Sequence, residues 1–190
     1  MSEKSNGKAG LIILLIILVV VAFSGISSYN GIVTRQEKVQ SARADIEAQL
    51  QRRADLIPNL VNTVKGYMAH ETAVIDSITA AREKLVGAAT LQEKSEASDA
   101  LTEAIKSFNV IVENYPDLKA NTNFIQLQDE IAGTENRIAT VRRDYNKAVE
   151  DYNSTIKRFP GRLFASWFGF EQADYFESRA GSDEVPNVQF

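Results

Sequence analysis

The sequence predicts an all-α protein in which an N-terminal transmembrane helix precedes an antiparallel up-and-down four-helix bundle with long helices. Three observations support this prediction. Residues 9–28 carry no charged side chain. Apolar residues beyond residue 29 recur at steps of three and four, which strands cannot maintain. The 190 residues include only 10 glycines and 4 prolines, too few for a turn-rich β protein. We therefore expect a tail (1–8), a membrane helix (9–28), a bundle domain (29–180) and a polar tail (181–190).

The apolar run has the length that a bilayer requires. About 20 uncharged residues form a helix that crosses a hydrocarbon core of about 30 Å. The alternative is a cleaved signal peptide, because small residues follow the run at Ser24 and Gly25, although neither an A-x-A site nor a lipobox cysteine is present. Basic residues are nearly balanced on the two sides, and Lys8 lies closer to the run than Arg35, which favours an N-terminus inside the cell.

The first bundle helix is expected to begin at Tyr29 and to end in a sharp turn before Pro58. Asp55 is a suitable N-cap for a second helix that begins at Leu56, and proline in a first turn loses no hydrogen bond. A kinked continuous helix is the alternative, because the apolar spacing continues past Pro58. The expected inward positions of the first helix are Tyr29, Val33, Ile46, Leu50 and Arg53.

Three further helices follow from the same spacing. The second continues to about Gly87, the third covers about 93–114, and the fourth covers about 121–159. Tyr115-Pro116 and Phe159-Pro160-Gly161 end the third and fourth helices, because the residue before a proline is disfavoured in helical conformation. The inward positions include Tyr67, Ile78 and Leu85, then Leu101, Ile105 and Phe108, then Phe124, Ile131, Ile138, Tyr145, Tyr152 and Phe159.

The composition excludes several classes of site. The chain has no cysteine and one histidine, His70, so a thiolate or histidine-rich metal shell cannot form, and His70 is expected to be solvated. No glycine-rich phosphate loop, H-E-x-x-H or G-x-S-x-G motif occurs. The net charge of −4 gives no reason to expect nucleic-acid binding. We expect no enzymatic activity and no cofactor.

Two polar clusters and one aromatic segment remain as candidate sites. The clusters are Arg52, Arg53 and Asp55, and Glu135, Asn136 and Arg137; each is either a binding patch or a polar layer that fixes helix register. The aromatic segment, within residues 162–176, contributes the candidate membrane-interface residues Arg162, Trp167, Phe168 and Phe170. Alternatively its rings cap the bundle core. If the first helix were continuous through Pro58, the chain would run along the bundle an odd number of times. The aromatic segment would then lie at the end of the bundle away from the membrane.

Several stretches match a known family in order. Residues 53–61 read RADLIPNLV, and residues 134–139 read TENRIA; Tyr145-Asn146, Tyr152-Asn153 and Phe168-Gly169-Phe170 follow. Together these motifs resemble the LemA family, and the resemblance covers the chain from the apolar run to about Phe176. Arg43 departs from the family pattern, which often has tryptophan there.

The resemblance implies a bacterial protein of the inner membrane with one N-terminal anchor and a helical bundle, and it implies no defined activity. Family descriptions tend to place the bundle on the cytoplasmic side, opposite to the charge-based preference, so the side stays open. We expect a non-enzymatic scaffold or adaptor whose partners are the lipid bilayer and other membrane proteins or further copies of the chain. The alternatives are a self-assembling membrane-shaping protein and a ligand-binding sensory bundle.

Overall fold

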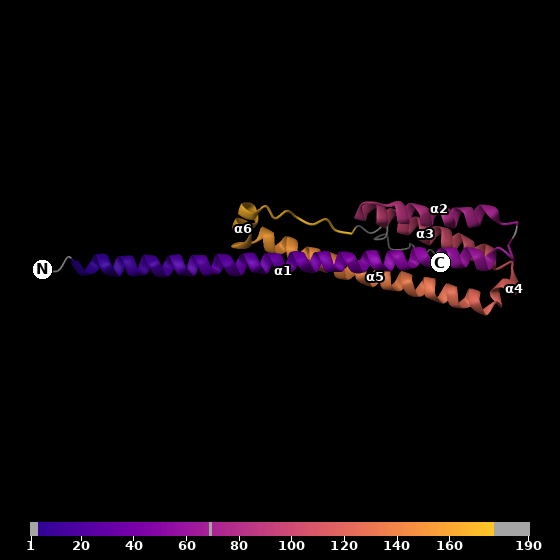
Figure 1. Ribbon diagram of the computed structural model, residues 1–190, viewed down its shortest axis with the longest axis horizontal. Helices are drawn as coiled ribbons and strands as arrows, with labels where there is room; N and C mark the ends of the chain where they lie inside the picture. Colours follow the sequence, from indigo (N-terminus) through magenta and orange to yellow (C-terminus); the bar gives the residue numbers. More distant parts are fainter. Residues whose placement is uncertain (1–3, 69, 177–190) are drawn as a thin grey trace, which may run out of the picture. The chain divides into compact units, whose positions relative to one another are not determined.

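The computed structural model describes residues 4–68 and 70–176, and its side chains from Gly10 onward apart from residue 69. Within these residues the regular structure is helical and contains no strand, so the predicted all-α fold, with an apolar N-terminal helix and a helical bundle, is confirmed. The predicted tail 181–190 lies outside the described residues. The helices are α1 (Lys4–Val64), α2 (Thr72–Gly87), α3 (Leu91–Val112), α4 (Pro116–Lys119), α5 (Thr122–Lys157) and α6 (Gly161–Phe168) (Figure 1).

The chain divides into two compact units. Of the described residues, unit 1 comprises 4–41 and 147–174, and unit 2 comprises 42–68, 70–146 and 175–176. The long helices α1 and α5 each contribute residues to both units. Each unit is described separately below.

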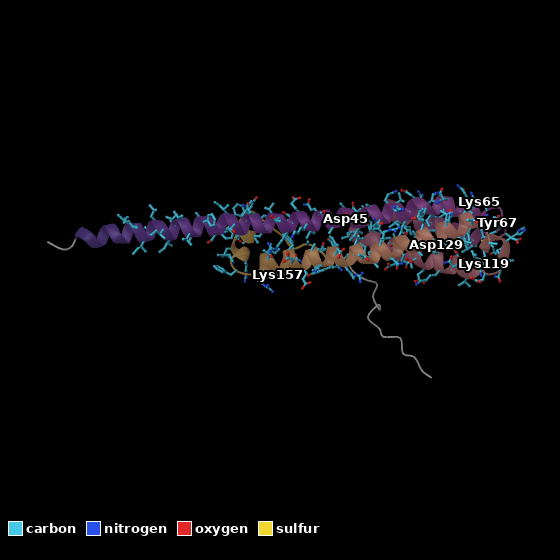
Figure 2. All side chains as sticks on the ribbon, turned by 90° about the horizontal axis from the view of Figure 1, so that it is seen from below. Asp45, Lys65, Tyr67, Lys119, Asp129 and Lys157 are labelled. Atoms are coloured by element: carbon cyan, nitrogen blue, oxygen red, sulfur yellow. The ribbon has the colours of Figure 1, made fainter. Side chains whose placement is uncertain are left out.

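The N-terminal part of α1, in unit 1, is exposed along its described length. Every side chain from Gly10 to Ser24 is exposed, and no other element lies beside this part of α1 in either view (Figures 1 and 2). Burial begins at Ile32 and Val39, not at the predicted Tyr29 and Val33, which are exposed and half-buried. The rest of the core of this unit comes from Val149, Tyr152, Asn153 and Ile156 of α5 and from Gly161 and Ala165 of α6.

Every helix in unit 2 contributes buried side chains to its core. The α2 and α3 helices pack on each other (Figure 1), and the rings of Phe108 and Phe124 meet edge to face with centroids 6.2 Å apart. The three- and four-residue spacing therefore identified most of this core from sequence. Its buried side chains include Ile46, Leu50, Ile57, Leu60 and Val64 of α1, Ile78 and Leu85 of α2, Leu101, Ile105 and Phe108 of α3, and Phe124, Ile131, Ile138 and Tyr145 of α5.

The predicted turn before Pro58 is wrong, because α1 passes through Pro58 without a break. Proline has no N–H, so the carbonyl of Ala54, four residues earlier, loses its helical partner. Arg82 of α2 replaces that partner: its Nε donates to the Ala54 carbonyl oxygen at 3.0 Å. The Ala54 residue is almost fully buried, so this hydrogen bond from a neighbouring helix allows proline to occupy the helix interior.

The helix breaks instead between Val64 and Thr72. Side chains from elsewhere in unit 2 hold this turn: Asn121 Nδ2 donates to Tyr67 Oη at 3.1 Å, and Tyr115 Oη donates to Glu71 Oε1 at 3.0 Å. Tyr67 is exposed, not inward as predicted. It lies at the same end of the unit as Lys65 and Lys119 (Figure 2). The alternative, a helix that continues past Pro58, is confirmed, although this helix ends at Val64 and a break still separates α1 from α2.

The ends of the later helices follow local signals. Thr90 and Glu93 form a capping box at the start of α3, in which the Thr90 hydroxyl accepts from the Glu93 N–H and the Glu93 carboxylate accepts from the Thr90 N–H. The Thr90 and Ala89 N–H groups hold the pKa of Glu93 below its usual range. Helix α5 ends at Lys157, so Phe159 lies past its end and is 82% exposed, contrary to the prediction that it faces the core.

Candidate functional site

The polar clusters meet in unit 2 around Arg53. The Arg53 side chain is only 1% exposed, and it donates from Nη1 to Thr102 Oγ1 at 2.9 Å and from Nη2 to Glu135 Oε2 at 3.3 Å. The bonds join α1 to α3 and to α5. Arg53 and Glu135, which are 82 residues apart in sequence, therefore belong to one site that spans three helices.

Burial governs the electrostatics of this site. Loss of water lowers the pKa of the Arg53 guanidinium, and the Glu135 carboxylate opposes that shift. Arginine keeps its charge in proteins because its ordinary pKa lies above about 12. Arg53 Nε is buried and has no hydrogen-bond partner among the described residues. A buried donor without a hydrogen bond costs free energy, so the site must be held by the packing around it and by the bonds of Arg53 to Thr102 and Glu135. A layer that fixes helix register and a binding patch both remain proposals for this site.

The other predicted cluster residues lie outside this buried site. Arg52 Nη2 and Arg137 Nη2 approach the Glu130 carboxylate at 3.1 and 3.6 Å, and all three side chains are about half exposed. Pairs this exposed contribute on the order of 0–1 kcal/mol. Asp55 accepts a hydrogen bond from Gln51 within α1 and is no N-cap, because the helix continues through it. Asn136 is exposed on α5, and His70 is exposed as expected.

Further polar contacts in unit 2 were not predicted. Arg142 Nη1 lies 3.4 Å from Asp99 Oδ1, and the Arg142 guanidinium stacks over the Phe176 ring at 4.5 Å. The Asn146 side chain holds the same residue through its main chain: Nδ2 donates to the Phe176 carbonyl at 3.0 Å and Oδ1 accepts from the Phe176 N–H at 2.8 Å. Phe176 is thereby buried to 3% exposure.

Unit 1 contains a second clamp of the same kind. Asn153 Nδ2 donates to the Ala173 carbonyl at 2.9 Å, and Asn153 Oδ1 accepts from the Ala173 N–H at 2.9 Å. Tyr152 Oη donates to the Glu171 carbonyl at 2.8 Å, and burial raises the pKa of Tyr152. Each clamp uses the asparagine of a Tyr-Asn pair, and the pairs are seven residues apart, two turns of α5. The repeated pair was the signal in the sequence, but its partner could not be identified there.

The aromatic candidates lie on α6 and just beyond it, in unit 1. Trp167 and Phe168 are 75% and 59% exposed, Arg162 is exposed and Phe170 is half-buried. The Tyr29 ring of α1 lies 4.9 Å from the Phe168 ring and 5.8 Å from the Phe170 ring, between centroids. The segment therefore contacts α1 one residue beyond the apolar run, although the first helix is continuous through Pro58.

Comparisons with known proteins agree on one family. The model of the LemA family matches residues 42–190. The chain is 26% identical to the magnetosome proteins MamQ 1 and MamQ 2 of Paramagnetospirillum magneticum, over 94% of its own length and 76% of theirs. It is 30% identical to protein LemA of Metamycoplasma hominis over 134 residues, which cover 68% of this chain and 60% of that protein.

Proposed function

The chain belongs to the LemA family, and from this premise we propose that it is a non-enzymatic scaffold or adaptor that α1 anchors in a membrane. Its bundle would bind other membrane proteins. The proposed location is the inner membrane of a bacterium, with a single crossing. The observation that carries the proposal is the junction between the apolar run and the folded helices.

That junction has no linker. One helix in the described part of the chain is long and apolar enough to cross a membrane, and none of its apolar window is buried. The same helix continues into the buried positions Ile32 and Val39. A soluble monomer rarely exposes a large contiguous apolar surface, whereas lipid would cover this one. The run therefore supports an anchor that is part of the fold.

A contact at Gly25 supports retention of the run over its cleavage as a signal peptide. A Cβ atom added at Gly25 would lie 3.1 Å from the Phe164 ring, so α6 approaches α1 closely here and a larger residue would force that ring to shift by a few tenths of an ångström. Cleavage between Ser24 and Asn30 would remove a surface on which α6 packs. Ser24–Asn30 also lies inside an unbroken helix.

The packing of unit 2 supports a scaffold over a ligand-binding bundle. A cavity beside Leu60, Phe108 and Ile131 measures about 80 Å³, and one beside Leu50 and Leu85 measures about 90 Å³. Sites for small molecules usually enclose about 300–1,000 Å³. A depression of about 600 Å³ lies where α2 meets α3, at Lys84, Gly87, Ala88, Glu93 and Glu96, but it is open to solvent and so does not enclose a ligand as such sites do.

Cross-linking in intact membranes tests the adaptor proposal. The full chain, carrying a photoreactive residue at Val110 or Val86, both of which are exposed on unit 2, would be irradiated and its adducts mapped by mass spectrometry. Defined adducts with other membrane proteins at these positions would support the adaptor. Adducts only between copies of the chain would support the self-assembling alternative and contradict the adaptor, and adducts with neither would contradict both.

A further inference from the structure

Helix α6 has two chemically different sides. Gly161 and Ala165 are buried, whereas Leu163, Trp167 and Phe168 are 48%, 75% and 59% exposed. Exposed aromatic and aliphatic side chains on one short helix are unusual for a surface in water. Leu163 and Trp167 share one face of α6 because they are four residues apart, whereas Phe168 lies beside the buried residues and contacts Tyr29. The face of Leu163 and Trp167 therefore lacks an apolar partner that covers it among the described residues.

The position of α6 along α1 identifies that partner. Its Phe164 ring approaches Gly25 of α1, and its Phe168 ring packs against Tyr29. The uncharged run ends at Ser28, so both contacts lie within one helical turn of the place where α1 would leave the hydrocarbon core. The exposed side of α6 is thus continuous with the apolar surface of α1 that lipid would cover.

The charges around α6 match a lipid surface. Lys157, Arg158 and Arg162 are all exposed, and residues 157–170 contain no acidic side chain. Tryptophan and basic side chains concentrate where a bilayer meets water, because the ring sits among the headgroups and the cation meets lipid phosphate. A protein partner would account for the apolar side chains but gives no reason for three cations beside them.

We infer that α6 with its flanking residues 157–162 is a second membrane contact, in which Trp167, Phe168 and Leu163 enter the interface of the same bilayer that α1 crosses. The basic side chains of Arg158 and Arg162 bind the phosphates of anionic lipids. The inference rests on the proposed anchoring by α1. It adds that the folded part of unit 1 itself touches the bilayer, which fixes α1 and α6 at a common depth.

Tryptophan fluorescence of the full chain tests this contact, because Trp167 is the only tryptophan. The protein would be placed at one copy per nanodisc made of phosphatidylcholine and phosphatidylglycerol, with or without bromine on the acyl chains. We expect brominated lipid to quench Trp167 at least two-fold. The matched control is the double variant Trp167→Phe, Val110→Trp, since Val110 is 71% exposed on α3 and the basic residue one turn away, Lys106, is paired with Glu103. Acrylamide, and not brominated lipid, should quench this control.

A second reporter separates failure of the contact from failure of the anchor. The chain has no cysteine, so Leu15→Cys gives one site for a spin label whose oxygen accessibility reports depth in the bilayer. If the spin label at residue 15 lies deep in the bilayer while acrylamide quenches Trp167 and brominated lipid does not, α6 makes no membrane contact but α1 is still an anchor. A label in water would overturn the anchor, and with it this inference.

Two further outcomes are equally decisive. If Trp167 is shielded from acrylamide in single-copy nanodiscs but not quenched by brominated lipid, protein covers it, and the inference is wrong. The double variant Arg158→Glu, Arg162→Glu should reduce bromine quenching at least two-fold in phosphatidylglycerol membranes and leave it nearly unchanged in pure phosphatidylcholine. Equal quenching of parent and variant in both membranes would contradict the part assigned to the two arginines.

Discussion

The hydrogen bond from Arg82 to the Ala54 carbonyl predicts that two distant residues are coupled through one atom. Pro58 removes the helical donor to that carbonyl, and Arg82 Nε supplies another at 3.0 Å. Arg82→Met keeps an apolar stem of similar length and removes the donor. We therefore expect the variant to unfold more easily than the parent, because Ala54 is 1% exposed and its carbonyl would lose its partner.

The size of the effect follows from that burial. A buried polar group left without a partner costs about 1–3 kcal/mol. In the background Pro58→Ala the residue at 58 donates its own N–H to Ala54, so the same loss of Arg82 should cost less than about 1 kcal/mol. The two changes should thus couple by at least about 1 kcal/mol. Pro58→Ala alone should stabilise the protein, by up to about 3 kcal/mol.

Urea unfolding in mild detergent, followed by circular dichroism at 222 nm, would be measured for the full-length parent, for Arg82→Met, for Pro58→Ala and for the double variant. The free-energy changes come from shifts of the midpoint at a shared slope. Arg52→Met is the control, because Arg52 forms only an exposed pair with Glu130 and should change stability by about 0–1 kcal/mol. If Arg82→Met costs the same with and without Pro58, Arg82 acts through packing and the reasoning fails.

Four further predictions concern other contacts. Arg53→Met should lower the midpoint of urea unfolding, because its bonds join three helices; a variant that unfolds like the parent yet loses its cross-linked partners would make this a binding site. Ile138→Ala should cost about 2–5 kcal/mol and Glu150→Ala almost nothing, and equal losses would mean that the core face of α5 is misassigned. Asn153→Ala should speed amide exchange in residues 171–174 selectively, measured by mass spectrometry; unchanged exchange there would refute the clamp. A hydrogen bond from Lys94 is the main cause that lowers the pKa of Glu47, so the stability that the Glu47 carboxylate contributes is present above the unfolded pKa of about 4.3 and is lost as the pH falls through the folded pKa. Glu47→Gln should therefore reduce the loss of unfolding free energy between about pH 5 and pH 3 in urea titrations, and an identical pH profile for variant and parent would contradict this.

The helices that could be predicted are those whose ends are set by nearby residues. Thr90 and Glu93 define the start of α3 through contacts three residues apart, and Tyr115-Pro116 blocks its extension, so α3 could be placed to within a few residues. The core side of α5 could be predicted because its side chains alternate at steps of three and four for most of its length. These features depend on local sequence alone.

The errors arose where a distant residue decides the conformation. Pro58 indicated a turn because its cost was judged within one helix, whereas the compensating donor is Arg82, 24 residues later. At the true break, Tyr67 accepts a hydrogen bond from Asn121, which is 54 residues away. The residues near Pro58 and near Tyr67 in the sequence do not indicate the contacts with Arg82 and Asn121.

The candidate site was predictable in part for the same reason. Arg53 and Glu135 stood out as polar residues on apolar helix faces, and the structure joins them directly. The Tyr-Asn pairs recur in the sequence, but the segments that they hold could not be identified, since a clamp on a main chain leaves no pattern in the residues that it holds. Side chains that bind backbone are identified only when the fold shows which segment lies against them.

The central claim is that α1 remains attached to the folded helices as a membrane anchor, and the intact mass of protein recovered from carbonate-washed membranes tests it most directly. The account predicts that the protein stays in the membrane pellet and that its mass includes the whole apolar run of residues 9–28. A chain released by carbonate, or one whose mass places its first residue between Ser24 and Asn30, would contradict the account.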